Sequence, residues 1–392
     1  MSISAYSTYN KARKKSGLWR SLRLVGPSHG GRTLLAGRLV LNFSSNDYMG
    51  LANHPALIAK SHEWTQKWGT GSTASRLVCG NMELFAEVEK RLLRGKGSEA
   101  ALVFGSGFGA NSGILSALLD RQILKEQPQV FSDRLNHASM HHGCRAAGVR
   151  QIRYRHNDLN HLEDLLKKSK KGPKFILSET VFSMDGDRAD VAGLLTLKKR
   201  YGAFLYLDEA HAAGVLGPAG LGLATEHSEK ADLVMGTFSK GLGGFGAYCV
   251  CSGELKDFLV NHCSGFIFAT ALPPGVLGAM AAALDMLPLM GEARENLLAQ
   301  GERLRGALVG AGLDVGNSST QIVPVILGDN QRCVEVSRLL EKRGMLGIAI
   351  RPPAVPVGKS RLRLSLTANH SVDDIDQLID GVIQSVGEVD RS

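Results

Sequence analysis

A lysine in a glycine-rich turn is the first residue of this sequence whose surroundings suggest chemistry. Lys240 lies in the run Thr-Phe-Ser-Lys-Gly-Leu-Gly-Gly at residues 237–244, directly after an apolar, strand-like run. A lysine amine among small residues can approach a carbonyl and form a Schiff base. The hydroxyls of Thr237 and Ser239 suit a phosphate, whereas the glycine spacing differs from that of a P-loop. The alternative is a surface lysine in a turn, and the next two segments argue against it.

An acidic residue and a histidine follow another apolar run. Residues 204–211 read Phe-Leu-Tyr-Leu-Asp-Glu-Ala-His, so that Asp208 ends a predicted strand and His211 comes three residues later. This spacing can present both side chains to one ligand at the carboxyl edge of a sheet. An Asp-x-x-His pair can also be half of a metal site, but no further ligand cluster lies nearby in the sequence. A helix cap is the other interpretation of this aspartate.

A glycine-rich turn after a third strand-like run could hold an anion. Residues 104–111 read Phe-Gly-Ser-Gly-Phe-Gly-Ala-Asn and open a predicted helix. Glycines let backbone N–H groups approach a phosphate, and a helix N-terminus favours its negative charge. The third glycine falls at Gly109, which departs from the G-x-G-x-x-G spacing typical of dinucleotide binding. A glycine-rich turn without a ligand is the alternative.

Together the three segments specify a single ligand. It has a phosphate for the turn, an aldehyde for Lys240, a ring nitrogen for Asp208 and a further polar group for His211. Pyridoxal phosphate has those groups. The Asp208 carboxylate would keep the pyridine nitrogen protonated, and the ring could then accept electrons from a substrate carbanion. The sequence therefore predicts a site for pyridoxal phosphate and none for a metal.

Short apolar runs alternate with helical periods between about residues 45 and 285, and they must position these turns. The predicted strands are residues 100–104, 129–132, 151–154, 175–179, 204–208, 233–236 and 246–251. Helical periods lie between several of them, as at 82–93 and 159–168. This alternation predicts an α/β fold with a mostly parallel seven-stranded sheet that helices cover on both faces.

The two ends of the chain have a different character. The first 40 residues are typical of an amphipathic helix followed by a short β element, with a loose helical spacing of Tyr6, Tyr9, Leu18, Trp19 and Leu22. The last hundred alternate three helical periods (292–310, 333–343, 372–386) with strand-like runs (321–327, 362–366). We therefore expect an N-terminal helix and β segment (1–45), a large cofactor-binding domain (46–285) and a smaller C-terminal α+β domain (286–392).

The composition excludes several other classes of protein. The chain has 392 residues. It contains 46 Lys and Arg and 37 Asp and Glu, which gives a net charge of +9. The basic residues are dispersed and lack aromatic interleaving, so we expect no nucleic-acid partner. Six scattered cysteines do not form a disulfide framework. The first residues lack a signal-peptide core, and prolines break the longest apolar stretch, 272–290, so we expect no membrane span and a cytoplasmic location.

A series of motifs along the chain resembles a known family, the α-oxoamine synthases, which are fold-type-I pyridoxal-phosphate enzymes. The matching stretches are residues 42–48, 69–76, 133–139, 181–187, 208–211, 237–240, 268–274, 350–356 and 361–364. The resemblance covers Leu18 to His370, and within the family it is greatest to members of the biotin pathway. It implies a large sheet domain with a smaller C-terminal α+β domain, pyridoxal 5'-phosphate as cofactor, and a homodimer with shared active sites.

The resemblance implies a role at the cofactor for each of four matching side chains. Lys240 would hold the cofactor covalently and then remove the Cα proton of the substrate. His137 would stack on the pyridine ring and later donate a proton. Asp208 would pair with the ring nitrogen, and His211 with the phenolic oxygen.

The resemblance implies further cofactor contacts as well. Ser183 is similar to a ring or phenolate contact, and Gly107, Phe108 and Thr237 would lie at the phosphate. Thr270 would reach the phosphate that the partner subunit holds. Three neighbouring groups receive no catalytic role: Glu179 would be a hydrogen-bond acceptor behind the site, and His141 and His142 would be structural.

Substrate contacts are implied for three positions besides His137. Asn46 and Arg363 match residues that orient the amino-acid carboxylate, and Arg20 matches one that meets the acyl substrate. Arg361 would share a strand face with Arg363 because side chains alternate along a strand, so either arginine could bind the carboxylate. The family register selects Arg363. Arg23 could replace Arg20 if the first helix is rotated.

The resemblance implies a decarboxylating condensation of an amino acid, expected to be L-alanine, with a pimeloyl-like acyl thioester. The thioester carrier would be coenzyme A or acyl carrier protein, and the product an α-amino ketone. A positive net charge suits such an anionic donor. Ala354 stands where biotin-pathway members have threonine, and with Ala74 it could admit a longer acyl chain. The sister activities therefore stay open: serine palmitoyltransferase, 5-aminolevulinate synthase, 2-amino-3-ketobutyrate ligase and the synthases of α-hydroxyketone signals.

Two other classes of function stay open at this point. An aminotransferase on the same fold would convert the cofactor with an amino acid alone. A non-catalytic binding protein would keep the fold but not the chemistry. The presence of Lys240, Asp208, His211 and His137 argues against the second of these alternatives.

Overall fold

The structure is a computed structural model that describes residues 3–391. The chain folds into two compact units. The larger unit comprises residues 47–182 and 188–294, and the smaller unit comprises residues 3–46, 183–187 and 295–391. The domain boundaries expected after residues 45 and 285 stay a prediction.

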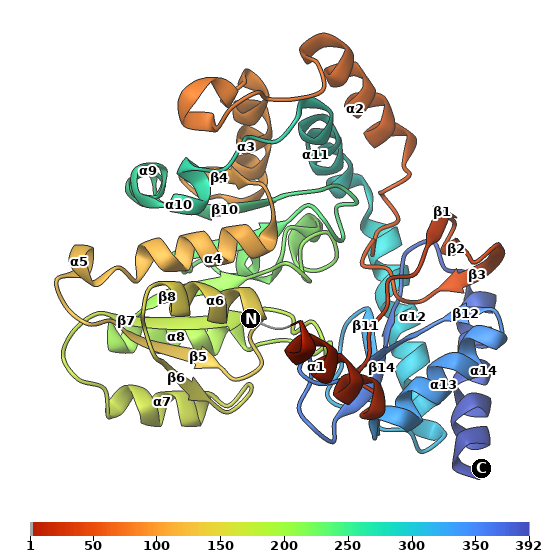
Figure 1. Cartoon of the computed structure of the whole chain (residues 1–392). Helices are drawn as coiled ribbons and strands as arrows, with labels where there is room; N and C mark the ends of the chain where they lie inside the picture. The colour runs from red at the N-terminus through yellow and green to blue at the C-terminus, as the bar shows by residue number, and fades with distance from the viewer. Residues whose placement is uncertain (1–2, 392) are drawn as a thin grey trace. The chain divides into compact units, whose positions relative to one another are not determined.

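A seven-stranded sheet forms the centre of the larger unit (Figure 1). Its order is β4-β10-β9-β8-β7-β5-β6, and only β10 runs antiparallel to its neighbours. The strands are β4 (Ala100–Phe104), β5 (Gln129–Asp133), β6 (Gln151–Tyr154), β7 (Lys174–Glu179), β8 (Phe204–Asp208), β9 (Leu233–Thr237) and β10 (Ala247–Cys251). Each forms within one residue of its predicted ends. The predicted α/β fold with a mostly parallel sheet is confirmed.

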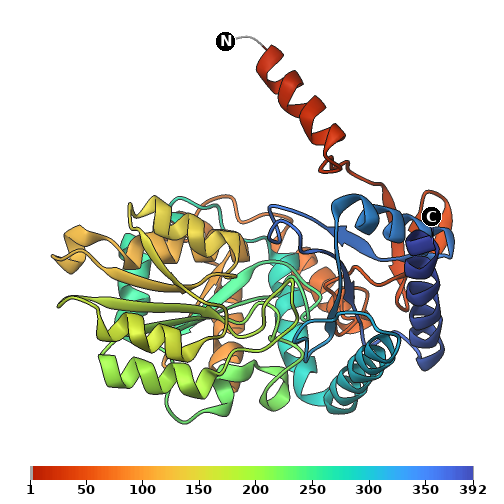
Figure 2. The ribbon, with the colours of Figure 1, turned by 90° about the horizontal axis from the view of Figure 1, so that it is seen from below.

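Helices lie on both faces of this sheet, as the view in Figure 2 shows. One face carries α4 (Gly107–Leu118) and α6 (Ala138–Ala146), and the other carries α7 (Leu159–Lys167) and α8 (Val191–Tyr201). Every residue of β4, β9 and β10 is buried, as expected for strands covered on both sides. The other helices of this unit are α2 (Pro55–Trp68), α3 (Glu83–Lys96), α5 (Arg121–Leu124), α9 (Gly253–His262), α10 (Ser264–Ile267) and α11 (Pro274–Met286).

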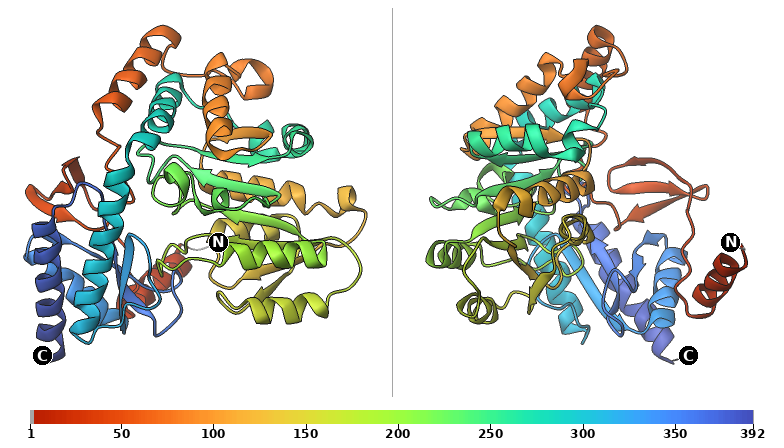
Figure 3. Two further views of the ribbon diagram at one scale, coloured as in Figure 1. Left: turned by 180° about the vertical axis from the view of Figure 1, so that it is seen from behind. Right: turned by 60° about the vertical axis from the view of Figure 1, so that its left-hand side comes forward.

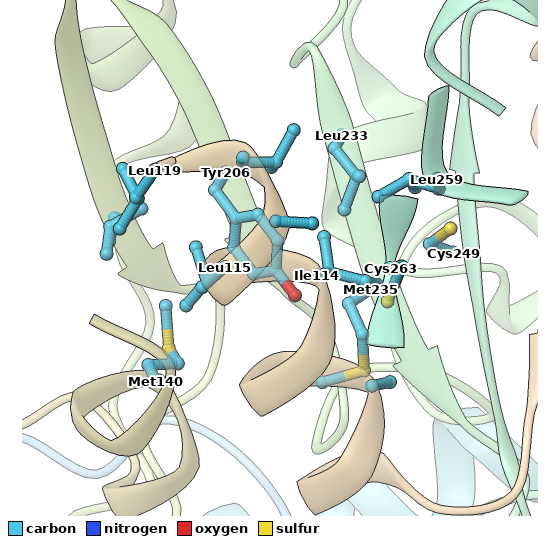
Figure 4. Close-up of a cluster of buried hydrophobic side chains, with 14 of the residues drawn as sticks. Ile114, Leu115, Leu119, Met140, Tyr206, Leu233, Met235, Cys249, Leu259 and Cys263 are labelled. Carbon is cyan, nitrogen blue, oxygen red and sulfur yellow. The ribbon is translucent and has the colours of Figure 1, made fainter. Parts of the chain in front are cut away.

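An apolar cluster fixes α4 against the sheet strands that carry the site. Ile114 and Leu115 of α4 pack with Tyr206 of β8 and Met235 of β9, and all four are at most 1% exposed (Figure 4). Burying side chains of this size contributes roughly 1.5–3 kcal/mol each. The start of α4 and the ends of β8 and β9 therefore hold a fixed spacing.

The smaller unit contains two sheets. The first has the order β1-β2-β3-β12 and the second the order β11-β14-β13. Their strands are β1 (Val25–His29), β2 (Arg32–Leu35), β3 (Arg38–Asn42), β11 (Ile322–Gly328), β12 (Met345–Leu346), β13 (Ile348–Ile350) and β14 (Ser360–Ser365). The helices are α12 (Gly291–Gly310), which begins in the larger unit, α13 (Asn330–Lys342) and α14 (Val372–Arg391). An ion pair of 2.7 Å between Arg303 and Asp376 joins α12 to α14, both visible in Figure 3.

The N-terminal helix is shorter than expected. α1 (Ser4–Lys15) buries none of its residues and ends in a Schellman turn, where Gly17 has φ +66° and Leu18 N–H donates to Arg13 O. Figure 2 shows α1 apart from the other elements of its unit. The interpretation of Leu18, Trp19 and Leu22 as part of an amphipathic helix was wrong, because Gly17 stops the helix before them.

Within residues 3–391, no single helix combines the length and the apolar composition of a membrane span. The consecutive segments Pro274–Leu289 and Gly291–Gly310 reach that composition only when taken together across a bend.

Candidate active site

A cavity of 180 Å³ lies in the larger unit, where β7, β8 and β9 end and α4 and α6 begin. Parallel strands end at the same edge of a sheet, so turns distant in the sequence meet there. Seven residues with predicted roles line this cavity: Gly107, Phe108, His137, Asp208, His211, Thr237 and Lys240. Ser239, whose hydroxyl was expected to suit a phosphate, also lines it. Asn111, Ser139, Ala210 and Met235 line it as well, and sequence reasoning gave these four no role.

The amine of Lys240 is joined to the interior of the unit through His211. Lys240 Nζ lies 2.6 Å from His211 Nε2, and His211 Nδ1 lies 2.6 Å from the hydroxyl of Tyr48, a fully buried residue. The turn that carries the lysine depends on Gly243, whose φ is +63° and whose Cβ would meet Ala52 N at 2.4 Å. His211 is thus held at both ring nitrogens. Sequence reasoning missed Tyr48, which lies far from His211 in the chain.

Asp208 is buried and hydrogen-bonded at both carboxylate oxygens. Its Oδ1 accepts from the backbone N–H of Ala210 at 2.8 Å, and its Oδ2 accepts from Asn111 Nδ2 at 2.7 Å. The Asn111 side chain is in turn fixed by Tyr206, whose hydroxyl donates to Asn111 Oδ1 at 2.7 Å. These donors stabilise a charged carboxylate at the end of β8.

His137 begins α6 and faces the same cavity. Its Nδ1 accepts from the backbone N–H of Ser139 at 3.3 Å and lies 2.7 Å from Ser139 Oγ. Burial lowers the pKa of His137 below its usual 6.5, and the positive charge of Lys240 adds to this effect while Asp208 opposes it. The imidazole is therefore neutral at pH 7, with its proton on Nε2.

The start of α4 lies beside the lysine turn and offers donors for an anion. Ser106 caps α4, where its Oγ accepts from Gly109 N–H at 3.1 Å, and a Cβ on Gly107 would lie 3.9 Å from Thr237 Oγ1. Thr237 Oγ1 and Ser239 Oγ both donate to Gly246 O, at 2.8 and 3.2 Å. Because these hydroxyl protons are engaged at Gly246 O, the donors for a phosphate are the backbone N–H groups at the N-terminus of this twelve-residue helix.

The remaining predicted cofactor residues lie outside this cavity lining. Thr270 is exposed and forms an isolated antiparallel bridge with Ser75. Ser183 belongs to the smaller unit, where its carbonyl accepts from Arg363 Nε at 2.5 Å. The cofactor roles of these two residues stay predictions. His141, which was expected to be structural, lies 2.7 Å from Gln151 Oε1 through its Nδ1.

The smaller unit brings together the predicted substrate residues Asn46 and Arg363. Arg363 is buried on β14, and its Nη1 donates to Asn46 Oδ1 at 3.1 Å and to Ser365 Oγ at 2.7 Å. The alternative, Arg361, instead forms an ion pair of 2.6 Å with Asp185 and is 4% exposed at its side chain. This pairing favours Arg363 over Arg361 as the residue that can receive a carboxylate.

The two candidates for the acyl contact also differ in their partners. Arg20 is exposed, and its Nη2 donates to the carbonyls of Arg351 and Pro352 at 3.4 and 3.1 Å, next to Ala354. Arg23 makes two bonds to Glu341, at 2.8 and 2.7 Å. Arg20 therefore lies beside the segment expected to contact the acyl group, whereas Arg23 is engaged elsewhere.

Comparison with known proteins identifies the family of the chain. The family model "Aminotransferase class I and II" matches residues 38–382. A Magnetococcus marinus protein provisionally named 8-amino-7-oxononanoate synthase is 60% identical over 98% of this chain and 98% of its own. The 8-amino-7-oxononanoate synthase of Gluconacetobacter diazotrophicus is 55% identical over 90% of this chain and 89% of its own.

Solved structures give the same result for the fold and cofactor. A serine palmitoyltransferase with an internal aldimine of pyridoxal phosphate has a TM-score of 0.91 at 28% identity, covering 99% of this chain and 98% of that one. The 8-amino-7-oxononanoate synthase of Francisella tularensis has a TM-score of 0.77 at 24% identity, covering 89% and 98%. The chain belongs to the aminotransferase class I and II family of fold-type-I enzymes that use pyridoxal phosphate, and within it to the α-oxoamine synthases. These are acyltransferases, so the chain is an enzyme that depends on pyridoxal phosphate.

Proposed function

We propose that this enzyme condenses L-alanine with a pimeloyl-like acyl thioester and releases carbon dioxide. A bond forms between alanine Cα and the thioester carbonyl carbon, the carbon–sulfur bond breaks, and the thiol of coenzyme A or acyl carrier protein leaves. The bond between Cα and the carboxylate then breaks, carbon dioxide leaves, and a proton takes its place on Cα. The product is an α-amino ketone of the 8-amino-7-oxononanoate type. The observation that carries this proposal is the 55% identity with the named synthase of Gluconacetobacter diazotrophicus, over nine-tenths of this chain.

The lining of the cavity fits pyridoxal phosphate. It offers a lysine amine, a buried charged carboxylate, a neutral imidazole and, at the start of α4, donors for a phosphate. The cofactor, when bound, supplies an aldehyde for an amine and a ring that withdraws electrons from the amino-acid Cα. We propose that Lys240 holds the aldehyde, that Asp208 holds the ring nitrogen protonated and that Gly107, Phe108 and Thr237 hold the phosphate.

The proton that leaves alanine Cα would move to Lys240 Nζ. His211 contacts this nitrogen at 2.6 Å and is itself held by Tyr48, so the acceptor has a fixed position. His137 is neutral at pH 7 and can stack on a ring in the cavity while its Nε2 carries a proton. In the smaller unit, Arg363 and Asn46 would bind the carboxylate of alanine, and Arg20 the acyl donor.

A second candidate is the condensation of serine with a long-chain thioester. The structural similarity to serine palmitoyltransferase, with a TM-score of 0.91, favours it, as does Ala354 in place of threonine. A lost hydroxyl removes one hydrogen bond, about 0.5–1.5 kcal/mol, which is too little to decide between the two substrates. The 28% identity to that enzyme is half of that to the named synthase.

A matrix of substrates tests the proposal. Alanine, glycine and serine are each combined with pimeloyl, shorter and long-chain thioesters of coenzyme A, and thiol release is followed with and without cofactor. We expect alanine with the pimeloyl donor to give the highest kcat/KM, and Lys240→Ala to abolish turnover with every pair. Preference for serine and a long chain would select the second candidate. Conversion of the cofactor by an amino acid alone, without a thioester, would indicate an aminotransferase.

The covalent role of Lys240 can be tested without any substrate. Borohydride reduction of the loaded enzyme, followed by peptide mapping, should place the cofactor label on Lys240. A label on another lysine, or none, would contradict the assignment of the whole cavity.

We also propose a homodimer in which Thr270 reaches the partner's cofactor phosphate. Lys240→Ala chains mixed with Thr270→Ala chains form hybrid dimers with one site of entirely native residues. We expect activity to return on mixing and refolding. No return, although hybrid dimers form, would place Thr270 at its own subunit's site or at none. The cytoplasmic location stays a prediction.

A further inference from the structure

Glu179, at the end of β7, is a buried acid in the cavity that the proposed chemistry does not use. Its side chain lines the cavity together with Asp208, His137 and Lys240, and the residue is 2% exposed. β7 and β8 pair in parallel register with Glu179 opposite Asp208, so the two carboxyl groups leave neighbouring strand ends side by side. Two carboxylates this close cannot both stay charged at low cost.

The hydrogen bonds decide which of the two carboxyl groups keeps the charge. Asp208 receives two donors, from Asn111 and from the backbone of Ala210. Glu179 receives the backbone N–H of His137, and its Oε1 is a buried oxygen with no partner among residues 3–391. A charged carboxylate would leave that oxygen unsatisfied, whereas a carboxylic acid can place a proton there.

We propose that Glu179 is a protonated carboxylic acid whose Oε1 hydroxyl donates a hydrogen bond to the molecule bound in the cavity. The proposal rests on the proposed function for the identity of that molecule, pyridoxal phosphate with its amino-acid substrate, but not for the protonation of Glu179. This role differs from the sequence-based expectation of a hydrogen-bond acceptor behind the site. A neutral acid that donates inside an apolar site is a known use of a raised pKa.

The groups that face Glu179 agree with a neutral acid. Burial raises the pKa of Glu179 well above its usual range, and the negative charges of Asp208 and Asp133 raise it further. Lys240 and the backbone N–H of His137 act in the opposite direction and are outweighed. His137 itself is neutral at pH 7, so it adds no positive charge.

The first test compares amide and alkyl replacements through cofactor affinity. Glu179→Gln keeps the shape, the neutrality and an N–H donor, and we expect it to bind pyridoxal phosphate like the native enzyme at pH 7. Glu179→Ala removes the donor, and we expect affinity to fall about tenfold, as for one lost hydrogen bond. Affinity is measured from the absorbance of the bound cofactor. An equal loss in both variants would show that the charge is needed, and no loss in Glu179→Ala would show that no contact exists; either overturns the proposal.

The second test uses the enzyme without cofactor and is independent of its reaction. A raised pKa means that the folded state holds the proton more tightly, so stability is full below the unfolded pKa and declines as pH rises through the folded pKa. We expect the urea midpoint of the native enzyme to fall relative to Glu179→Gln as pH rises from 5 to 9. The matched control is Glu229→Gln, at an exposed position. The difference in urea midpoint between the native enzyme and this variant should not change with pH. A constant difference between native enzyme and Glu179→Gln would overturn the neutral acid even if the proposed reaction is right.

Discussion

The side-chain amide of Asn111 holds Asp208 and Ser139 at the same time. Its Nδ2 lies 2.7 Å from Asp208 Oδ2 and 2.9 Å from Ser139 Oγ, while Ser139 Oγ lies 2.7 Å from His137 Nδ1. Asn111, Asp208 and Ser139 are all buried. One amide thereby connects the carboxylate expected at the ring nitrogen with the histidine expected on the ring face.

Replacing this amide by a carboxylate should weaken the site. Asn111→Asp keeps the shape but faces Asp208 with a second negative charge, so one of the two acids must take up a proton. Losing a hydrogen bond to a charged group costs about 1.5–3 kcal/mol, and we expect cofactor affinity at pH 8 to fall about tenfold or more. Absorbance titration measures it, with the exposed Asn261→Asp as control. Unchanged affinity at pH 8 would show that Asn111 does not support the charge of Asp208.

Removing the Tyr48 hydroxyl should slow the proton transfer at Lys240. Tyr48→Phe fills the same buried volume but breaks the 2.6 Å bond to His211, so the imidazole is held at one nitrogen only. We expect kcat to fall about tenfold, the equivalent of one hydrogen bond, with little change in melting temperature. Steady-state kinetics and thermal unfolding measure the two effects. A large loss of stability with unchanged kcat would make Tyr48 a packing residue only.

Substitutions of the two arginines of β14, Arg361 and Arg363, should affect different properties of the enzyme. Arg363→Lys loses the planar fork that faces Asn46, and we expect KM for the amino acid to rise about tenfold or more. Arg361→Lys weakens the ion pair with the half-buried Asp185, and we expect lower stability with a nearly unchanged KM. Steady-state kinetics at saturating thioester give the KM for the amino acid, and urea unfolding gives the stability. The reverse pattern would assign the carboxylate to Arg361.

The stability of the smaller unit should depend on pH through His370. This ring packs on Phe43 with a centroid distance of 4.3 Å, and burial lowers the pKa of His370 from 6.5 to about 4. A lowered histidine pKa means that the folded state resists protonation, so stability is full above pH 6.5 and declines as pH falls toward 4. The loss in the free energy of unfolding approaches about 3 kcal/mol. Urea unfolding between pH 4 and 7 measures this slope, and His370→Gln should flatten it. A slope unchanged in that variant would assign the effect to other groups.

The large sheet and the candidate active-site cavity could be predicted from the sequence because both follow from local patterns. Short apolar runs bounded by polar turns mark strands that are buried on both faces, and their carboxyl ends must share one edge. Lys240, Asp208, His211 and the turn at Gly107 come together for that reason. The family motifs supplied His137, which follows β5 and lacks any local signal of its own.

Other parts of the site depend on contacts between residues distant in the chain. Tyr48 reaches His211 through tertiary packing, so no spacing in the sequence reveals the pair. Asn111 did offer a signal, because a buried amide in the apolar helix α4 needs polar partners. Glu179 was recognised at a strand end, but its protonation depends on the neighbouring strand, and pairing order is not visible in an apolar run.

The strand β3 pairs in parallel with β12, although the whole larger unit lies between them in the chain. During synthesis, β3 leaves the ribosome early and its partner strand emerges only near the end. Domains tend to fold as they emerge from the ribosome, so the larger unit can fold first. At that stage the C-terminal part of the smaller unit has not yet been synthesised. A truncation before residue 345 should therefore leave a folded sheet domain and a three-stranded N-terminal sheet whose β3 edge lacks its partner, a substrate for chaperones and proteases.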